Sequence, residues 1–200
     1  MKKNINLFII SYLIFLTISV ISCDDGCGGN ASKYTITDFD WQQKKIENTD
    51  QGYQDYTIEN EVNFDEYGIF ITPIKESYYA STFDFNIINK TYACSPVEPT
   101  TIDKITNIEI ITNTNFDTTH LEGSNIVEYF DIASYLPDFN ESNIEDFLNL
   151  NQNQLNHFIL ILKQAPLTVG EMSFTIKITL NANDSEVFEF TTSAITITNN

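Results

Sequence analysis

Apolar and polar residues alternate along most of this chain, and that alternation restricts which folds it can form. In the segment 172–180, five apolar residues from Met172 to Leu180 alternate with serine, threonine and lysine residues. A period of two residues places alternate side chains on opposite faces of a β-strand. The segment therefore predicts a strand with one buried face and one solvated face.

The same pattern, with turn residues between the segments, predicts eight or nine short strands. After turn residues at 181–184, the segment 187–192 returns as a hairpin partner, and a last strand follows around Ile195 and Ile197. The segment 157–162 is apolar almost throughout, which indicates a strand buried on both faces. The other predicted strands are 34–39, 56–62, 68–74, 82–88 and 105–112.

Two segments with helical spacing interrupt the strands. Residues 142–145 have the pattern of a capping box, with Ser142 as the N-cap and Glu145 three residues later. A weaker helical turn is predicted to begin at Ser124 and to carry apolar residues from Ile126 onward.

These elements predict a mainly β fold, a single β-sandwich over residues 33–200 with one or two short helices. The hairpins near the C-terminus indicate an immunoglobulin-like arrangement. The Cys…Trp…Cys core of immunoglobulin domains is absent, because Trp41 precedes Cys94 but no pair of cysteines frames it.

The N-terminal segment is typical of a lipoprotein signal peptide. Lys2 and Lys3 precede an apolar run that ends in Val20-Ile21-Ser22-Cys23, a pattern in which the cysteine becomes the lipidated N-terminus. We expect a signal peptide at 1–22 and a lipidated flexible tether at 23–32, held in a membrane by acyl chains such as palmitate. A retained transmembrane helix over 5–22 is the alternative.

Two resemblances add to this interpretation. Asp24-Asp25, directly after Cys23, resembles the acidic export signal of Bacteroidota lipoproteins, which implies a place in the outer membrane facing the cell exterior. Otherwise these acids belong to a polar, glycine-rich spacer. The runs 92–96 and 120–124 resemble uncharacterised lipoproteins of similar length, and that group implies no activity.

The net charge of the chain limits the kinds of partner that it can bind. The chain has 28 acidic residues against ten lysines and no arginine, a formal net charge of −18. Loss of residues 1–22 would remove two lysines and leave 178 residues at −20. Such a domain repels nucleic acid and anionic lipid surfaces, and suits cationic partners, divalent ions or neutral glycans. The same charge also keeps an exported protein soluble.

The cysteines and histidines offer little chemistry. Cys27 and Cys94 are candidates for a disulfide in an oxidising compartment, with two free thiols as the alternative. A catalytic Cys94 would need a histidine base, and nothing in the sequence places His120 or His157 beside it.

No metal or other cofactor is predicted. The alternating polar residues at 113, 115 and 117, and again at 138, 140 and 142, resemble the start of a calcium loop. Both lack glycine at the sixth position and glutamate at the twelfth, so neither is an EF-hand, and turn formation explains them better. Two isolated histidines cannot supply a usual transition-metal site.

Aromatic residues and one threonine are the candidate functional positions. Trp41, Tyr78 and Tyr79 could form a platform for a sugar or a partner protein, although tyrosines also pack on half-buried strands. Asp117-Thr118-Thr119 resembles the O-glycosylation sequon of Bacteroidota secreted proteins, which implies a glycan on Thr118 in an exposed loop.

The sequence therefore predicts a membrane-anchored, surface-exposed lipoprotein that binds an unknown protein or glycan and has no catalytic activity. No G-x-S-x-G, Walker, G-x-G-x-x-G or H-E-x-x-H motif occurs. One alternative is a periplasmic accessory of an outer-membrane complex that pairs a strand edge with its partner. The other is a glycan hydrolase that uses two of the many carboxylates. The pairs Asp38/Asp40 and Glu59/Glu61 are expected to lie along one face of a strand as solvated charges.

Overall fold

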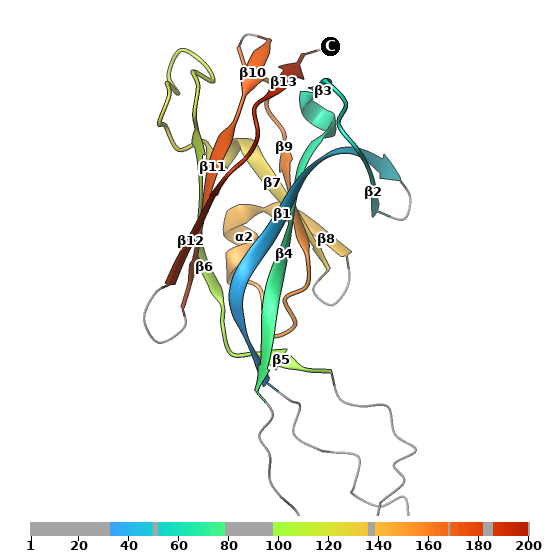
Figure 1. Ribbon diagram of the computed structural model, residues 1–200, viewed down its shortest axis with the longest axis vertical. Helices are drawn as coiled ribbons and strands as arrows, with labels where there is room; N and C mark the ends of the chain where they lie inside the picture. The colour runs from blue at the N-terminus through green and yellow to red at the C-terminus, as the bar shows by residue number, and fades with distance from the viewer. Residues whose placement is uncertain are drawn as a thin grey trace, which may run out of the picture. The chain divides into compact units, whose positions relative to one another are not determined.

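The computed structural model describes residues 33–49, 52–78, 98–135, 139–167, 169–181 and 186–199 (Figure 1). Nearly all of them belong to one unit, formed by Lys33–Tyr79 and Pro99–Asn200. The predicted signal peptide and tether, the three cysteines and the predicted strand 82–88 lie outside the described residues. No helix in the described ranges is long and apolar enough to cross a membrane.

Short strands account for most of this unit, and they are joined by a few helical turns. The strands are β1 (Lys33–Thr49), β2 (Gly52–Tyr56), β3 (Glu61–Asn63), β4 (Tyr67–Tyr78), β5 (Thr100–Thr101), β6 (Ile105–Thr112), β7 (Phe130–Tyr135), β8 (Phe139–Asn143), β9 (Phe158–Leu162), β10 (Gly170–Met172), β11 (Phe174–Leu180), β12 (Glu186–Thr191) and β13 (Ile195–Thr198). The helical elements are the 3₁₀ turns η1 (Phe64–Glu66) and η2 (Val127–Tyr129) and the α-helix α2 (Ile144–Asn149).

The strands form three sheets. The largest has the order β2-β1-β4-β9-β7-β8, with β5 beside the start of β1. A second sheet has the order β12-β11-β6, and a third the order β10-β13-β3. All pairs are antiparallel except β5 with β1 and β3 with β13. The predicted mainly β sandwich is confirmed, whereas the immunoglobulin-like arrangement stays a prediction.

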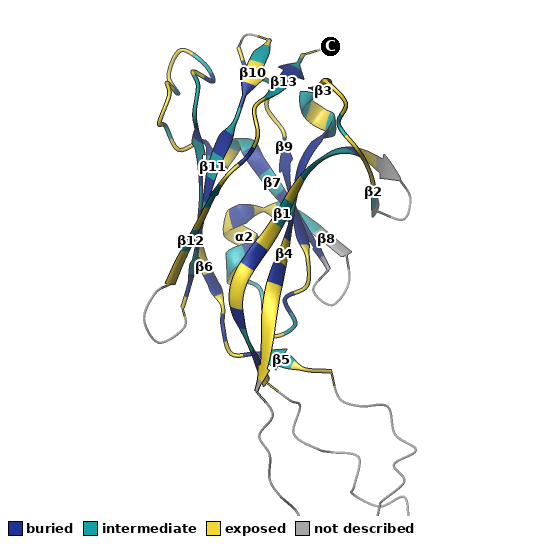
Figure 2. Ribbon diagram, viewed as in Figure 1, coloured by how far each residue is buried: buried dark blue, intermediate teal, exposed yellow. Residues whose placement is uncertain are grey.

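The main core lies between the large sheet and the β6–β11–β12 sheet, to which both contribute their buried faces (Figure 2). Phe174 of β11 packs against the large sheet: its ring centroid is 5.8 Å from that of Tyr67 on β4 and 5.5 Å from that of Phe130 on β7. Because rings contribute much of the apolar area in a core, this cluster holds the two layers together.

Strand β9 is buried on both faces, as predicted from its apolar run. Its inner side chains join the main core, while Ile159 and Ile161 join Ile46 and Ala133 in a second cluster on the outer face. Ile46 comes from strand β1, which arches across the sheet and is far longer than the predicted strand 34–39 (Figure 1). A Cβ on Gly68 of β4 would lie 2.9 Å from Ile46, so only glycine allows this close approach.

Two predicted strands each divide between two sheets. The segment 56–62 is not one strand, because β2 ends at Tyr56 as the hairpin partner of β1 and β3 pairs with β13. The segment 172–180 divides at Ser173 between two sheets. At that division Thr192 satisfies the backbone of Phe174 in place of a residue in a neighbouring strand. Its backbone N–H donates to Phe174 O and its hydroxyl accepts from Phe174 N, both at 2.9 Å.

Both predicted helix starts also need correction. The capping box of α2 lies one residue later than predicted, because Asn143 is the N-cap and its Oδ1 accepts from Asp146 N at 2.8 Å. Asn143 Nδ2 in turn donates to the Asp146 carboxylate. The turn predicted at Ser124 is η2, where Asn125 Oδ1 accepts from Val127 N at 3.2 Å.

We expect Gly68→Ala to lower the free energy of unfolding by about 1–3 kcal/mol, because the new methyl group would overpack the Ile46–Ile159 contact. Urea unfolding measures the change. Gly170→Ala is the matched control, since a Cβ there would meet nothing within 4 Å. Equal stability of the two variants would contradict the close packing of β1 over β4.

Candidate functional site

The sandwich has two long sides between its sheets, and aromatic pairs close one of them. Phe39 of β1 meets Phe188 of β12 edge to face, with ring centroids 5.3 Å apart. Trp41 stacks on Phe190 of the same strand, also at 5.3 Å and with ring planes 11° apart. These two contacts join β1 to β12.

The opposite side, between β6 and β8, contains a groove of about 360 Å³. Helix α2 contacts β6, β7 and β8 there and forms one wall, and η2 with the start of β7 forms another. The residues that line the groove are Asn107, Ile108, Val127, Glu128, Phe130, Asn143, Ile144, Glu145 and Leu148. We call this feature the α2 groove.

The local sequence holds the walls of the α2 groove in place. The Asn143 cap begins α2 at the end of β8, and Ile144 and Phe147 anchor the helix in the core. Leu148 is half-buried and lines the groove. On the other side, buried Ile126 fixes the start of η2.

The α2 groove combines an apolar lining with a polar rim. Five of the nine lining residues are apolar, and the others are two asparagines and two glutamates. Glu128 comes from η2 and Glu145 from the first turn of α2, and both are exposed. Because its only charged residues are acidic, the groove suits an apolar group with a positive charge nearby.

A hydrogen-bonded cluster lies next to the groove and includes one of its residues. His120 Nδ1 is 2.9 Å from Asp117 Oδ2, and His120 Nε2 is 3.2 Å from Glu128 Oε1. The Tyr129 hydroxyl donates to Asp117 Oδ2 at 3.1 Å. Asp117 Oδ1 also accepts from the backbone N–H groups of Thr119 and His120. The cluster thus ties the loop after β6 to η2 through Glu128.

These contacts shift both titrating groups toward their charged forms. The hydrogen bond from His120 holds the pKa of Asp117 well below its usual range, and the same bond is the main reason why the pKa of His120 is raised. Both nitrogens face carboxylates, which favours the protonated form of His120 and places its ring between two acids. That arrangement suits a structural role better than that of a general base.

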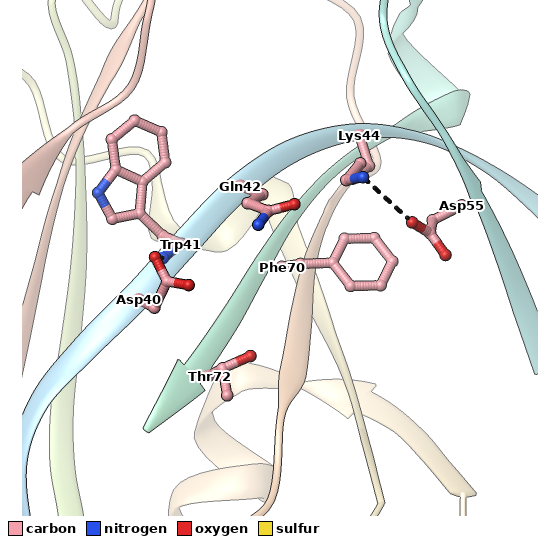
Figure 3. A pocket seen from close by; sticks show the side chains of 7 residues that line it. All are labelled: Asp40, Trp41, Gln42, Lys44, Asp55, Phe70 and Thr72. Carbon is pink, nitrogen blue, oxygen red and sulfur yellow. Dashed lines mark hydrogen bonds and ion pairs between the residues drawn. The ribbon is translucent and has the colours of Figure 1, made fainter. Parts of the chain in front are cut away.

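The predicted aromatic platform is only partly described. Trp41 is half-buried against Phe190, and its indole lies on the other side of β1 from Phe70 and Thr72 (Figure 3). Tyr79 and the side chain of Tyr78 lie outside the described residues. The platform therefore stays a prediction.

A shallow hollow of about 140 Å³ lies beside Trp41, and five of its seven lining residues are polar. It is lined by Asp40, Trp41, Gln42, Lys44, Asp55, Phe70 and Thr72, and Lys44 Nζ is 3.4 Å from Asp55 Oδ2 (Figure 3). The acids of the pairs Asp38/Asp40 and Glu59/Glu61 are exposed.

Thr118 is exposed in a bend between Asp117 and Thr119, as its predicted modification requires. The glycan itself stays a prediction. Nearby, Asn113 accepts from the Thr175 hydroxyl and Asn115 from Glu122 N, which are turn and strand contacts. Asp138 and the side chain of Asn140 lie outside the described residues. Within the described ranges, no group of three or more His, Cys, Asp or Glu residues is placed to hold a metal ion.

Sequence reasoning did not single out the α2 groove or the His120 cluster. The groove joins residues 107–108 to residues 127–148, and no local pattern links segments so far apart. The signal that the sequence offered was the apolar Leu148, which lies one helical turn after Ile144 on a helix with a predicted cap. Comparison with known proteins adds no family, because no family model, curated protein or solved structure matches the chain.

We expect the His120 cluster, formed by Asp117, His120, Glu128 and Tyr129, to stabilise the fold most between about pH 4 and pH 6.5. These limits are the ordinary pKa values of Asp and His. A raised histidine pKa contributes stability that is lost as pH rises through it, and a lowered aspartate pKa contributes stability that is lost as pH falls. Wild type should therefore lose more stability between pH 6 and pH 8.5 than His120→Gln, measured by urea unfolding.

An NMR titration supplies the control. Asp117→Asn should move the pKa of His120 down toward its ordinary value, because the largest cause of the raised value is removed. An unchanged titration in that variant would contradict the assigned contact.

Proposed function

We propose that this chain is a lipid-anchored, surface-exposed module that binds a segment of a partner protein in the α2 groove and catalyses no reaction. The observation that carries the proposal is the groove itself, an apolar floor with an acidic rim at an open side of the sandwich. At about 360 Å³ it falls within the range of ligand sites.

The lining favours a protein partner over a glycan. Sugar sites combine flat, exposed rings with many polar groups, whereas this floor consists of Ile108, Val127, Phe130, Ile144 and Leu148. An apolar centre surrounded by polar side chains is the usual form of a protein–protein contact. Trp41, the strongest candidate for a sugar platform, already stacks on Phe190.

The groove also gives little support to the hydrolase alternative. Glu128 and Glu145 both line it, so two carboxylates are present. However, Glu128 accepts from His120, and the groove floor between its walls is apolar. We therefore assign the acidic rim to recognition of a cationic group, with Glu145 as the main contact because Glu128 already pairs with His120.

The predicted anchor supports the location. The run Val20-Ile21-Ser22-Cys23 and the following Asp24-Asp25 are the reasons for proposing lipidation and export to the outer face. The net charge of −20 that remains after loss of residues 1–22 would attract cationic partners to a domain held there by its tether.

We expect Cys23→Ala to abolish incorporation of labelled palmitate when the chain is expressed in a Bacteroidota host, because the acyl acceptor is removed. Cys27→Ala is the matched control and should keep the label. On intact cells, protease should remove an epitope within residues 100–200 of wild type but not of a variant with Asp24→Ala and Asp25→Ala. Equal labelling of Cys23→Ala and wild type would rule out the anchor.

We expect the full chain in detergent to bind members of a random peptide array that carry apolar residues next to lysine or arginine. Leu148→Gln should weaken binding about tenfold or more, since burying a leucine side chain is worth about 1.5–3 kcal/mol. Leu167→Gln is the matched control, because Leu167 is 64% exposed and does not line the groove. Binding that Leu148→Gln leaves unchanged would exclude the α2 groove as the site.

A further inference from the structure

Strand β6 is an edge strand, and the hydrogen-bonding groups on its outer edge can be followed one by one. It pairs with β11 on one side only. Along an antiparallel edge strand, the N–H and C=O groups of alternate residues point away from the partner. On β6 these outward positions are Ile105, Ile108, Ile110 and Thr112, with a register shift opposite Thr179 and Leu180.

A side chain covers the first outward position. The buried amide of Gln152 accepts from Ile105 N at 2.8 Å through Oε1 and donates to Ile105 O at 3.2 Å through Nε2. Gln152 is 3% exposed. Its amide thus replaces the peptide group of a neighbouring strand.

The loop before η2 covers the last two outward positions. Ile126 N donates to Ile110 O at 2.8 Å, and Asn125 Oδ1 accepts from Ile110 N at 3.1 Å. Thr112 N donates to Ser124 O, and Gly123 N donates to Thr112 O. This end of the edge is therefore closed to a partner strand.

Ile108 lies between the two covered stretches and is different. No residue in the described part of the chain pairs with its outward N–H and C=O. Ile108 is only 2% exposed, and it lines the α2 groove. Buried backbone groups are nearly always paired in proteins, and among the described residues this is the one outward position of β6 that an added backbone could pair with.

We infer that Ile108 is the docking point for an extended, cationic segment of the partner protein, which adds to β6 by a single residue pair. One partner residue exchanges both backbone hydrogen bonds with Ile108, and its apolar neighbour packs on Leu148 and Val127. A lysine or arginine beside it meets Glu145, because Glu128 already pairs with His120. This inference rests on the proposed function and specifies how the partner is recognised.

The geometry also limits the length of the pairing. Gln152 blocks the edge at Ile105, and Asn125 and Ile126 block it at Ile110. A long strand cannot pair along β6, so the segment must be a loop tip or a chain end. Selectivity then comes from the groove and its two acids, since a single residue pair carries little sequence information.

Hydrogen exchange and backbone-modified peptides test the inference. The probes are acetylated, amidated pentapeptides Lys-Val-Ile-Val-Lys, each with one backbone N-methyl group at a different position, and the counterpart with glutamate in place of lysine. We expect the Ile108 amide of the free chain to exchange faster than that of Ile110, and to become protected when the unmodified peptide binds.

N-methylation should weaken binding about tenfold or more at one peptide position and less than twofold at the neighbouring positions, because only one residue donates to Ile108. The glutamate peptide should not bind. Glu145→Gln should weaken binding of the lysine peptide severalfold, whereas Glu171→Gln, which removes an exposed acid outside the groove, should not.

Three outcomes would overturn the inference. If N-methyl groups at all positions are equally tolerated and Ile108 stays unprotected, while Leu148→Gln still abolishes binding, strand pairing is wrong and the proposed function stands. Protection of the Ile108 amide in the free chain would show that the edge is already closed. Failure of every lysine peptide, together with array binding that is insensitive to Leu148→Gln, would remove both proposals.

Discussion

Two sheets that share one core leave it open along two sides, and the way in which each side is closed determines the rest of this structure. On one side, Phe39 and Trp41 of β1 meet the rings of Phe188 and Phe190 on β12. On the other, α2 crosses between β8 and β6. A six-residue helix covers less than a strand, so the α2 groove remains between it and η2.

The parts of the fold that could be predicted from sequence are those in which one segment belongs to one sheet. Segment 105–112 was predicted with its observed bounds because its alternation and its buried face belong to one sheet. The segments 56–62 and 172–180 were wrong because each contributes to two sheets, and alternation cannot reveal a change of partner. The β1 arch depends on Ile46 meeting Gly68, a contact that no local pattern contains.

The candidate site was harder to predict, for a similar reason. A cap for α2 was visible in the sequence, although the pair that forms it is Asn143 and Asp146. The groove needs that helix to lie against β6, some forty residues earlier in the chain. His120 was considered as a base for Cys94 and as a metal ligand, whereas its contacts are with Asp117 and Glu128. Proximity in the fold assigns such residues a role, and composition cannot.

Edge strands expose backbone groups that other chains can pair with, and proteins usually cover them. Here the covering of β6 is almost complete, and it uses Gln152 at one end and the 123–126 loop at the other. A chain that needed only protection from aggregation would gain from covering Ile108 as well. Instead that position opens into an apolar groove whose only charges are two carboxylates. An edge closed on both sides of one residue admits a short segment and rejects a long strand, which allows recognition without general adhesion.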